Sequence, residues 1–169
     1  KITRKEFLEK LSLFAVGAIT LPALLSFIMP DYDSVLVKAE DPRIESEMID
    51  YDSPKGAGTM KGLLSKPKNT TKKLPGIVVV HENRGLNPYI KDVGRRAAVG
   101  GYISIAPDAL TPLGGYPGND DLGRTMQRKR DRNEMLEDFI AAFEFLKNHP
   151  NCSGKVGVVG FCFGGWISN

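Results

Sequence analysis

The stretch KVGVVGFCFGG, residues 155–165, decides the fold of this chain. Its first half, residues 155–160, is apolar after Lys155 and is typical of a strand buried on both faces of a parallel sheet. Gly160 and Gly164 then allow the chain to turn abruptly from this strand into a helix. Such a turn presents Cys162 at its tip in a strained backbone conformation, which is the geometry of a nucleophile elbow with Cys in place of Ser.

Cys162 has the surroundings that a reactive thiol needs. At a helix N-terminus it faces unpaired amides and the positive end of the helix dipole, which favour the nucleophilic thiolate. The amide of Phe163 is expected to point at the developing oxyanion of a substrate. The other interpretation is an inert structural cysteine beside a glycine-rich turn. A disulfide with Cys152 is excluded, because the strand between them spans roughly 20 Å and a bridge needs Cα atoms within about 7 Å.

Upstream of this stretch, strand-like and helix-like segments alternate. We predict a hairpin of Met48–Asp52 and Thr59–Ser65, a strand at Gly76–Val80, a helix at Pro88–Gly100, a strand at Tyr102–Ala106 and a helix at Glu134–Asn148. Residues 111–133 hold four Gly and two Pro, and are predicted to form a long surface loop with at most one turn of helix. The alternation predicts an α/β fold, a mostly parallel sheet with an antiparallel hairpin at its start.

The N-terminal segment differs from the rest of the chain. Leu11–Met29 is uncharged, follows several Lys and Arg, and precedes acidic residues, which is the layout of an export signal. The motif TRKEFL, residues 3–8, resembles the twin-arginine consensus with Lys5 in place of the second Arg, and cleavage after Ala39 is expected. An uncleaved membrane anchor or a helix packed on the domain are the alternatives.

These observations divide the chain into residues 1–39, an export signal or membrane anchor, and a domain at residues 40–169. The domain is expected outside the cytoplasm, in the periplasm or another extracytoplasmic space, and to meet a membrane only through the N-terminal segment. With 23 Lys and Arg against 20 Asp and Glu, the 169-residue chain has no basic tract that would indicate nucleic-acid binding. Two cysteines exclude a disulfide scaffold, and no metal or cofactor motif is found.

Residues 47–169 resemble the dienelactone hydrolase family of α/β-hydrolases. The motifs that carry the resemblance are IVVVHENRG at residues 77–85, IAPD at residues 105–108 and the elbow at residues 155–165. The export-like segment is similar to that of an exported subgroup. The resemblance implies an α/β-hydrolase fold, no cofactor, and hydrolysis of a small ester or lactone through an acyl-enzyme on Cys162.

The resemblance also implies roles for other residues. Glu82 matches a carboxylate that contacts the thiol in the resting enzyme, and the amides of Asn83 and Phe163 would form the oxyanion hole. Arginines of the family bind a substrate carboxylate; Arg124 is the first candidate here and Arg84 the second. The alternatives are a capping or surface role for Glu82 and exposed surface guanidinium groups for the two arginines.

The catalytic triad of this fold runs nucleophile, acid, His along the chain. Only seven residues follow Cys162, and none is Asp, Glu or His. His81 and His149 both precede the nucleophile, so His81 is expected to be a poor general base and His149 to occupy a helix end.

We therefore expect the N-terminal portion of an α/β-hydrolase, truncated after the elbow. These 169 residues are predicted to have negligible esterase activity and to associate through the exposed strand at residues 155–160. The alternative function is that of a non-catalytic exported or membrane-tethered α/β binding protein, or of the product of a broken gene.

Overall fold

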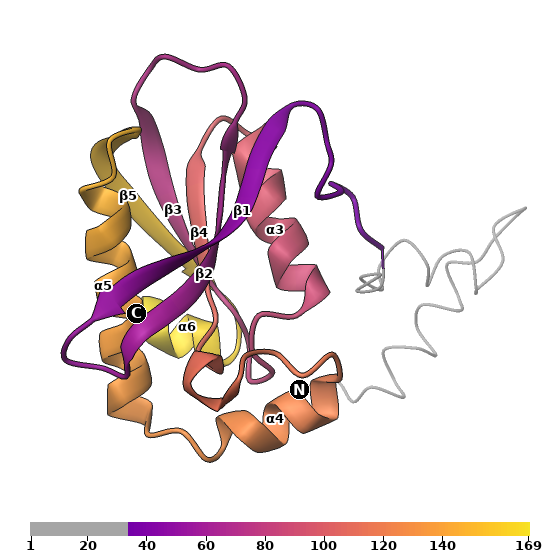
Figure 1. Ribbon diagram of the computed structural model, residues 1–169, viewed down its shortest axis with the longest axis vertical. Coiled ribbons are helices and arrows are strands. Elements are labelled where there is room, and N and C mark those ends of the chain that lie inside the picture. The colour runs from indigo at the N-terminus through magenta and orange to yellow at the C-terminus, as the bar shows by residue number, and fades with distance from the viewer. Residues whose placement is uncertain (1–33) are drawn as a thin grey trace, which may run out of the picture. The chain divides into compact units, whose positions relative to one another are not determined.

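The computed structural model describes residues 34–169 (Figure 1). Its elements are β1 Ile44–Ser53, β2 Gly58–Pro67, β3 Leu74–Val80, α3 Pro88–Val99, β4 Ile103–Pro107, a 3-10 turn at Thr111–Leu113, α4 Asp120–Gln127, α5 Arg132–Lys147, β5 Cys152–Gly160 and α6 Phe163–Ser168. One compact unit spans Val35–Asn169, and so begins five residues before the domain boundary expected from the sequence. The apolar run at residues 11–29 lies outside the described residues. Within residues 34–169, no helix combines the length and apolar character needed to cross a membrane.

The five strands form one mixed sheet in the order β1-β2-β4-β3-β5. The β1–β2 hairpin is antiparallel, and β2 also pairs with β4 in the antiparallel sense. Strand β3 pairs in parallel with β4 on one side and β5 on the other. The predicted α/β architecture, a parallel centre preceded by an antiparallel hairpin, is confirmed.

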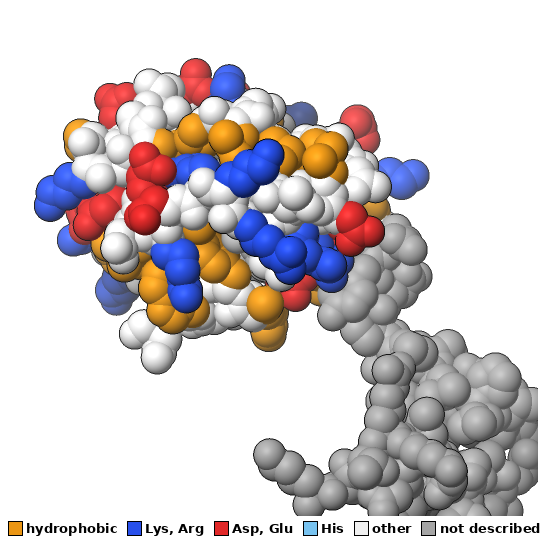
Figure 2. Space-filling view, turned by 90° about the horizontal axis from the view of Figure 1, so that it is seen from below, with side chains coloured by type: hydrophobic (Ala, Val, Ile, Leu, Met, Phe, Trp, Pro, Cys, Tyr) orange, Lys and Arg blue, Asp and Glu red, His pale blue; other side chains and the backbone are white. Residues whose placement is uncertain are grey.

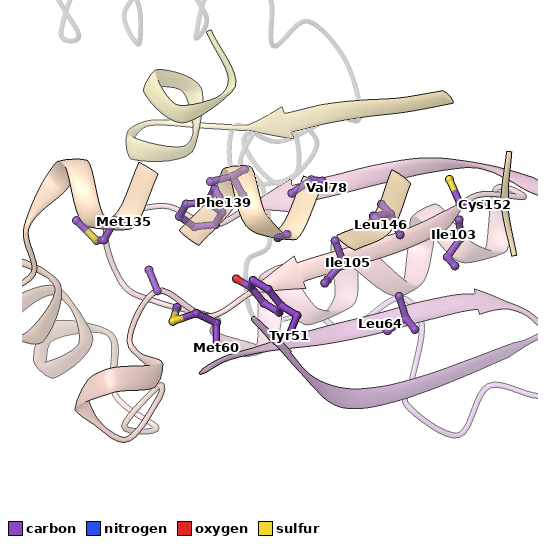
Figure 3. Packing of buried hydrophobic residues seen from close by; sticks show 13 residues of the cluster. Tyr51, Met60, Leu64, Val78, Ile103, Ile105, Met135, Phe139, Leu146 and Cys152 are labelled. Atoms are coloured by element: carbon purple, nitrogen blue, oxygen red, sulfur yellow. The ribbon is translucent and has the colours of Figure 1, made fainter. Parts of the chain in front are cut away.

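Alternate side chains of β3 pack on opposite faces of the sheet, as strand geometry requires. Val78 and Val80 join the large core cluster on the side of α5, where Phe139 and Leu146 also lie (Figure 3). Val79 joins a second cluster with Ile90 of α3. The sheet is therefore covered by α3 on one face and by α5 and α6 on the other.

A buried ion-pair network fastens α5 to the β1–β2 hairpin. The Asp138 carboxylate accepts a bond from Arg130 Nη2 at 2.7 Å and another from the amide of Ala57 at 2.9 Å. The hydroxyl of Tyr51 donates to the Asp138 carbonyl oxygen at 3.2 Å. Because Asp138 is 1% exposed, a loss of Arg130 would leave a buried charge without its partner.

The prediction of a long loop at residues 111–133 is wrong, because the eight-residue helix α4 lies within it. Asn119 caps this helix by accepting a bond from the Leu122 amide at 2.9 Å, and two acidic residues occupy its first turn. Gly123, which argued for a loop, allows close packing instead, since a Cβ there would collide with the Arg84 carbonyl oxygen. The helix therefore packs against the loop that follows β3.

The segment before β1 is tied to α3. The amide of Val37 donates to Asp92 Oδ1 at 2.7 Å, and its carbonyl oxygen accepts from Arg95 Nε at 2.6 Å. Val37 is 5% exposed and packs with Ile44 and Ala98 in a small apolar cluster. Burial lowers the pKa of Arg95. Residues 35–39 are therefore part of the folded domain.

Candidate active site

The loops that carry the predicted site residues leave neighbouring strands at one end of the sheet (Figure 1). Val80 of β3 is paired with Gly160 of β5, so Glu82 and Cys162 each lie two residues beyond this pair. After β3 the chain passes to the α3 face, and after β5 it passes to the α6 face. Adjacent parallel strands with opposite connections leave a crevice at their carboxyl ends, where α/β proteins bind ligands.

The turn after β5 has the strained geometry of an elbow. Cys162 has φ 56° and ψ −117°, a positive φ that it shares with one other non-glycine residue among those described, Asn69. A Cβ on Gly160 would lie 2.6 Å from the backbone of Gly164, and a Cβ on Gly164 would lie 2.5 Å from the carbonyl oxygen of Val80. Glycine at both positions is what lets α6 fold back onto β3 while Cys162 stays exposed.

His81 is a buried support of the elbow. Its Nε2 accepts a bond from the Ala109 amide at 3.1 Å, so the proton is on Nδ1, which donates to the Glu82 carbonyl oxygen at 2.6 Å. Burial lowers the pKa of His81 and keeps the ring neutral. The ring stacks on Phe163 with centroids 6.1 Å apart. Both nitrogens are occupied, which leaves His81 to position Phe163 rather than to take up a proton from the thiol.

The loop after β3 is anchored by α4 and by the end of β4. Gln127 donates to the Glu82 carbonyl oxygen at 3.2 Å and accepts from the Gly85 amide at 3.0 Å. Asp108 accepts from the Leu86 amide at 3.3 Å. No motif marks Gln127, which lies on α4 within the predicted loop, whereas Asp108 is the polar end of the strand motif at residues 105–108. Glu82 itself is half-buried beside this anchored backbone.

A cavity of about 310 Å³ lies beside the elbow. Its lining residues are Asn83, Arg124, Gln127, Arg128, Arg130, Arg132, Met135 and Phe163. Both residues predicted for the oxyanion hole and the first substrate-binding candidate, Arg124, therefore meet in one place. No acidic side chain lines it. Figure 2, which views this end of the sheet, shows Lys and Arg side chains gathered on the surface.

Arg84, the second candidate, does not line this cavity. Its guanidinium forms an ion pair with Asp120 at 2.7 Å and so fastens the β3 loop to α4. His149 is also elsewhere, in a cavity of about 570 Å³ between the hairpin turn and α5. Its Nδ1 accepts a bond from the Asn151 amide at 3.2 Å, and burial together with Lys66 lowers the pKa of His149. Within residues 34–169, no three His, Cys, Asp or Glu side chains form a group suited to a metal ion.

A mixed sheet with parallel strands β4, β3 and β5 and an elbow at the end of β5 defines the α/β-hydrolase class of proteins. The model of the dienelactone hydrolase family matches residues 60–169, and the chain belongs to this family.

The relatives match different shares of their own length. The hydrolase fragment YghX of Escherichia coli is 52% identical over 113 residues, which are 66% of this chain and 97% of that protein. A protein of Synechocystis described as a carboxymethylenebutenolidase is 36% identical over 55% of this chain and 41% of its own length. The crystal structure of a protein from Klebsiella pneumoniae described as a dienelactone hydrolase is 27% identical, with a TM-score of 0.59 over 72% of this chain and 52% of that one. The chain thus spans about half or less of the latter two relatives.

Proposed function

We propose that Cys162 is the nucleophile of an enzyme that hydrolyses esters or lactones. The observation that carries the proposal is the exposed thiol on a positive-φ elbow, beside a cavity lined by Asn83 and Phe163. The thiolate sulfur attacks the carbonyl carbon, and the carbonyl oxygen becomes an oxyanion that accepts bonds from the two amides. The C–O bond then breaks, the alkoxide leaving group takes a proton from water, and the acyl group remains on sulfur as a thioester.

Other residues of the crevice support this first half-reaction. The half-buried carboxylate of Glu82 lies on the neighbouring loop and is proposed to help remove the thiol proton. Arg124, which lines the cavity, is proposed to bind a carboxylate of the substrate. The amide of Asn83 is held in a backbone that Gln127 and Asp108 anchor, which makes it a preorganised donor.

The second half-reaction needs a base that activates water against the thioester. The chain has two histidines; His81 has both nitrogens occupied, and His149 lines a different cavity. We propose that these 169 residues form the acyl-enzyme but turn over negligibly, and that the base for deacylation comes from groups outside them.

Acylation by p-nitrophenyl acetate tests the nucleophile. We expect one equivalent of nitrophenolate in a burst, and one acetyl group on the peptide that contains Cys162. Cys162→Ala should abolish both, whereas Cys152→Ala, which removes the buried thiol, is the matched control and should retain both. Acetylation that persists in Cys162→Ala would overturn the assignment and favour a non-catalytic binding protein. Sustained turnover by the wild-type chain would contradict the proposed lack of a base.

The domain is further proposed to act outside the cytoplasm, because the apolar N-terminal run and its charged flanks have the layout of an export signal. Fractionation of cells that produce the full chain should find it outside the cytoplasm or at the membrane. Replacement of Arg4 and Lys5 by Gln should retain it in the cytoplasm if the signal acts as proposed.

A further inference from the structure

The positive charge around the 310 Å³ cavity is only partly balanced. Four of its eight lining residues are arginines. The charge of Arg130 is taken up by Asp138 at 2.7 Å and Glu134 at 3.0 Å. Arg124 has one acidic neighbour, Asp121, at 3.4 Å. An arginine this close to a single exposed carboxylate is still available to a ligand.

The other two arginines, Arg128 and Arg132, form no ion pair within residues 34–169. The Arg132 guanidinium lies over the Trp166 ring, 4.1 Å from its centroid. A guanidinium stacked on an aromatic face keeps the donors at its edge free for an anion. Trp166 belongs to α6, the helix that follows the nucleophile, so this stacking directs Arg132 to the same end of the crevice as the elbow.

We propose that the cavity takes a small substrate that carries two negative charges, and that Arg128 and Arg132 determine this specificity. The inference rests on the proposed function and adds a second anionic contact to the one assigned to Arg124. A single carboxylate could pair bidentately with the guanidinium of Arg128 or of Arg132, and the positive charge of the other arginine would stay unbalanced. The volume is at the lower end of the roughly 300–1,000 Å³ that small-molecule sites occupy. Two carboxylates or one phosphate would supply the charge.

Alkylation of Cys162 tests the proposal without any need for turnover. Iodoacetate carries a negative charge and iodoacetamide does not, so the ratio of their rates reports the field at the thiol. Peptide mass spectrometry at low ionic strength follows Cys162, and buried Cys152 should stay unmodified while the chain is folded. We expect the double variant Arg128→Gln/Arg132→Gln to lower the iodoacetate-to-iodoacetamide ratio about fivefold.

Lys129→Gln is the matched control, because Lys129 is exposed between two of these arginines and does not line the cavity. Lys129→Gln should lower the iodoacetate-to-iodoacetamide rate ratio by less than half of the decrease that the double variant causes. An equal effect would show a general surface field and overturn the proposal.

Protection of Cys162 against iodoacetamide by added anions shows how many negative charges the cavity binds, and whether carboxylates or a phosphate group supply them. Succinate or phosphate should slow alkylation at concentrations where acetate does not, and the double variant should lose this protection. Protection by succinate alone supports two carboxylates, and protection by phosphate alone supports a phosphate group. Equal protection by acetate and succinate would overturn the dianion. If p-nitrophenyl acetate fails to acylate Cys162 while selective protection persists, the proposed catalysis fails but the dianion site stands.

Discussion

The neighbouring strands β3 and β5 each supply half of the candidate site, but they are held very differently. Val78, Val79 and Val80 of β3 are 1–2% exposed, and the strand is paired on both sides. Val158 and Val159 of β5 are each 39% exposed, and among the described residues β5 pairs only with β3. Two strands in matched register therefore differ chiefly in what covers them.

The loops that follow the two strands differ in the same way. The β3 loop is anchored by Gln127, by Asp108 and, through His81, by the Ala109 amide. The turn after β5 has mainly local bonds, such as the Gly164 amide to the Phe161 carbonyl oxygen at 2.9 Å. The backbone around Asn83 is thus anchored to the core, whereas the position of Cys162 depends on the less protected strand.

Opposite valines provide the largest test of this difference, because Val79 and Val159 are register partners. We expect Val79→Asp to abolish folding, since it would bury an unpaired charge at a cost above about 4 kcal/mol. Val159→Asp should cost less than about 1 kcal/mol and reduce self-association, because a charge at an edge strand opposes strand pairing. Urea unfolding and light scattering measure both effects. Equal loss of structure in the two variants would show that β5 is as protected as β3.

A smaller effect is expected where α6 folds back onto β3. A Cβ added at Gly164 would meet the carbonyl oxygens of Val80 and His81 at 2.5 and 2.9 Å, so Gly164→Ala should cost about 1–3 kcal/mol of unfolding free energy. It should also slow alkylation of Cys162. Gly157→Ala is the control, because no atom lies within 4 Å of the added Cβ. If Gly164→Ala and Gly157→Ala have equal free energies of unfolding, the close packing of the elbow against the end of β3 is contradicted.

The smallest effect concerns pH. Burial lowers the pKa of His81 from its ordinary 6.5. On acidification, the His81 ring is therefore protonated at a higher pH in the unfolded chain than in the folded chain. The free energy of unfolding should therefore fall between pH 7.5 and 5.5, by at most about 1.4 kcal/mol per pH unit for this residue. His81→Gln should flatten this slope. His149→Gln, at the partly buried histidine, should flatten it less, and the reverse order would contradict the anchoring role of His81.

The strands and the elbow could be predicted because their signals are local. The β-branched run at residues 76–80 and the glycines at 160 and 164 dictate their own conformations. Helix α4 could have been found as well, since Asn119 followed by two aspartates is a helix start. Its Gly123 was misleading because the close packing against Arg84 that requires glycine is a tertiary contact.

The cavity could not be predicted in the same way. No sequence motif supports Arg124, the first candidate, over Arg84, the second, and the three-dimensional contacts separate them. Arg84 is engaged by Asp120, whereas Arg124 lines the cavity together with Arg128 and Arg132. The pair of Arg84 with Asp120 joins residues 36 positions apart and depends on how α4 packs against the β3 loop, so no spacing in the sequence encodes it.

The hydrogen bonds between Val37 and α3 bear on the cleavage after Ala39 that the sequence predicts. A peptidase that cuts after Ala39 would remove Val37, which is a hydrogen-bond partner of both buried Asp92 and buried Arg95, and would leave Asp92 with its ion pair to Arg96. A chain cleaved after Ala39 therefore cannot keep the contacts that Val37 makes with α3 in this structure. A mature protein that starts at residue 40 would have to solvate or re-pair these two side chains of α3, whereas one that starts at or before Val35 would keep them as they are.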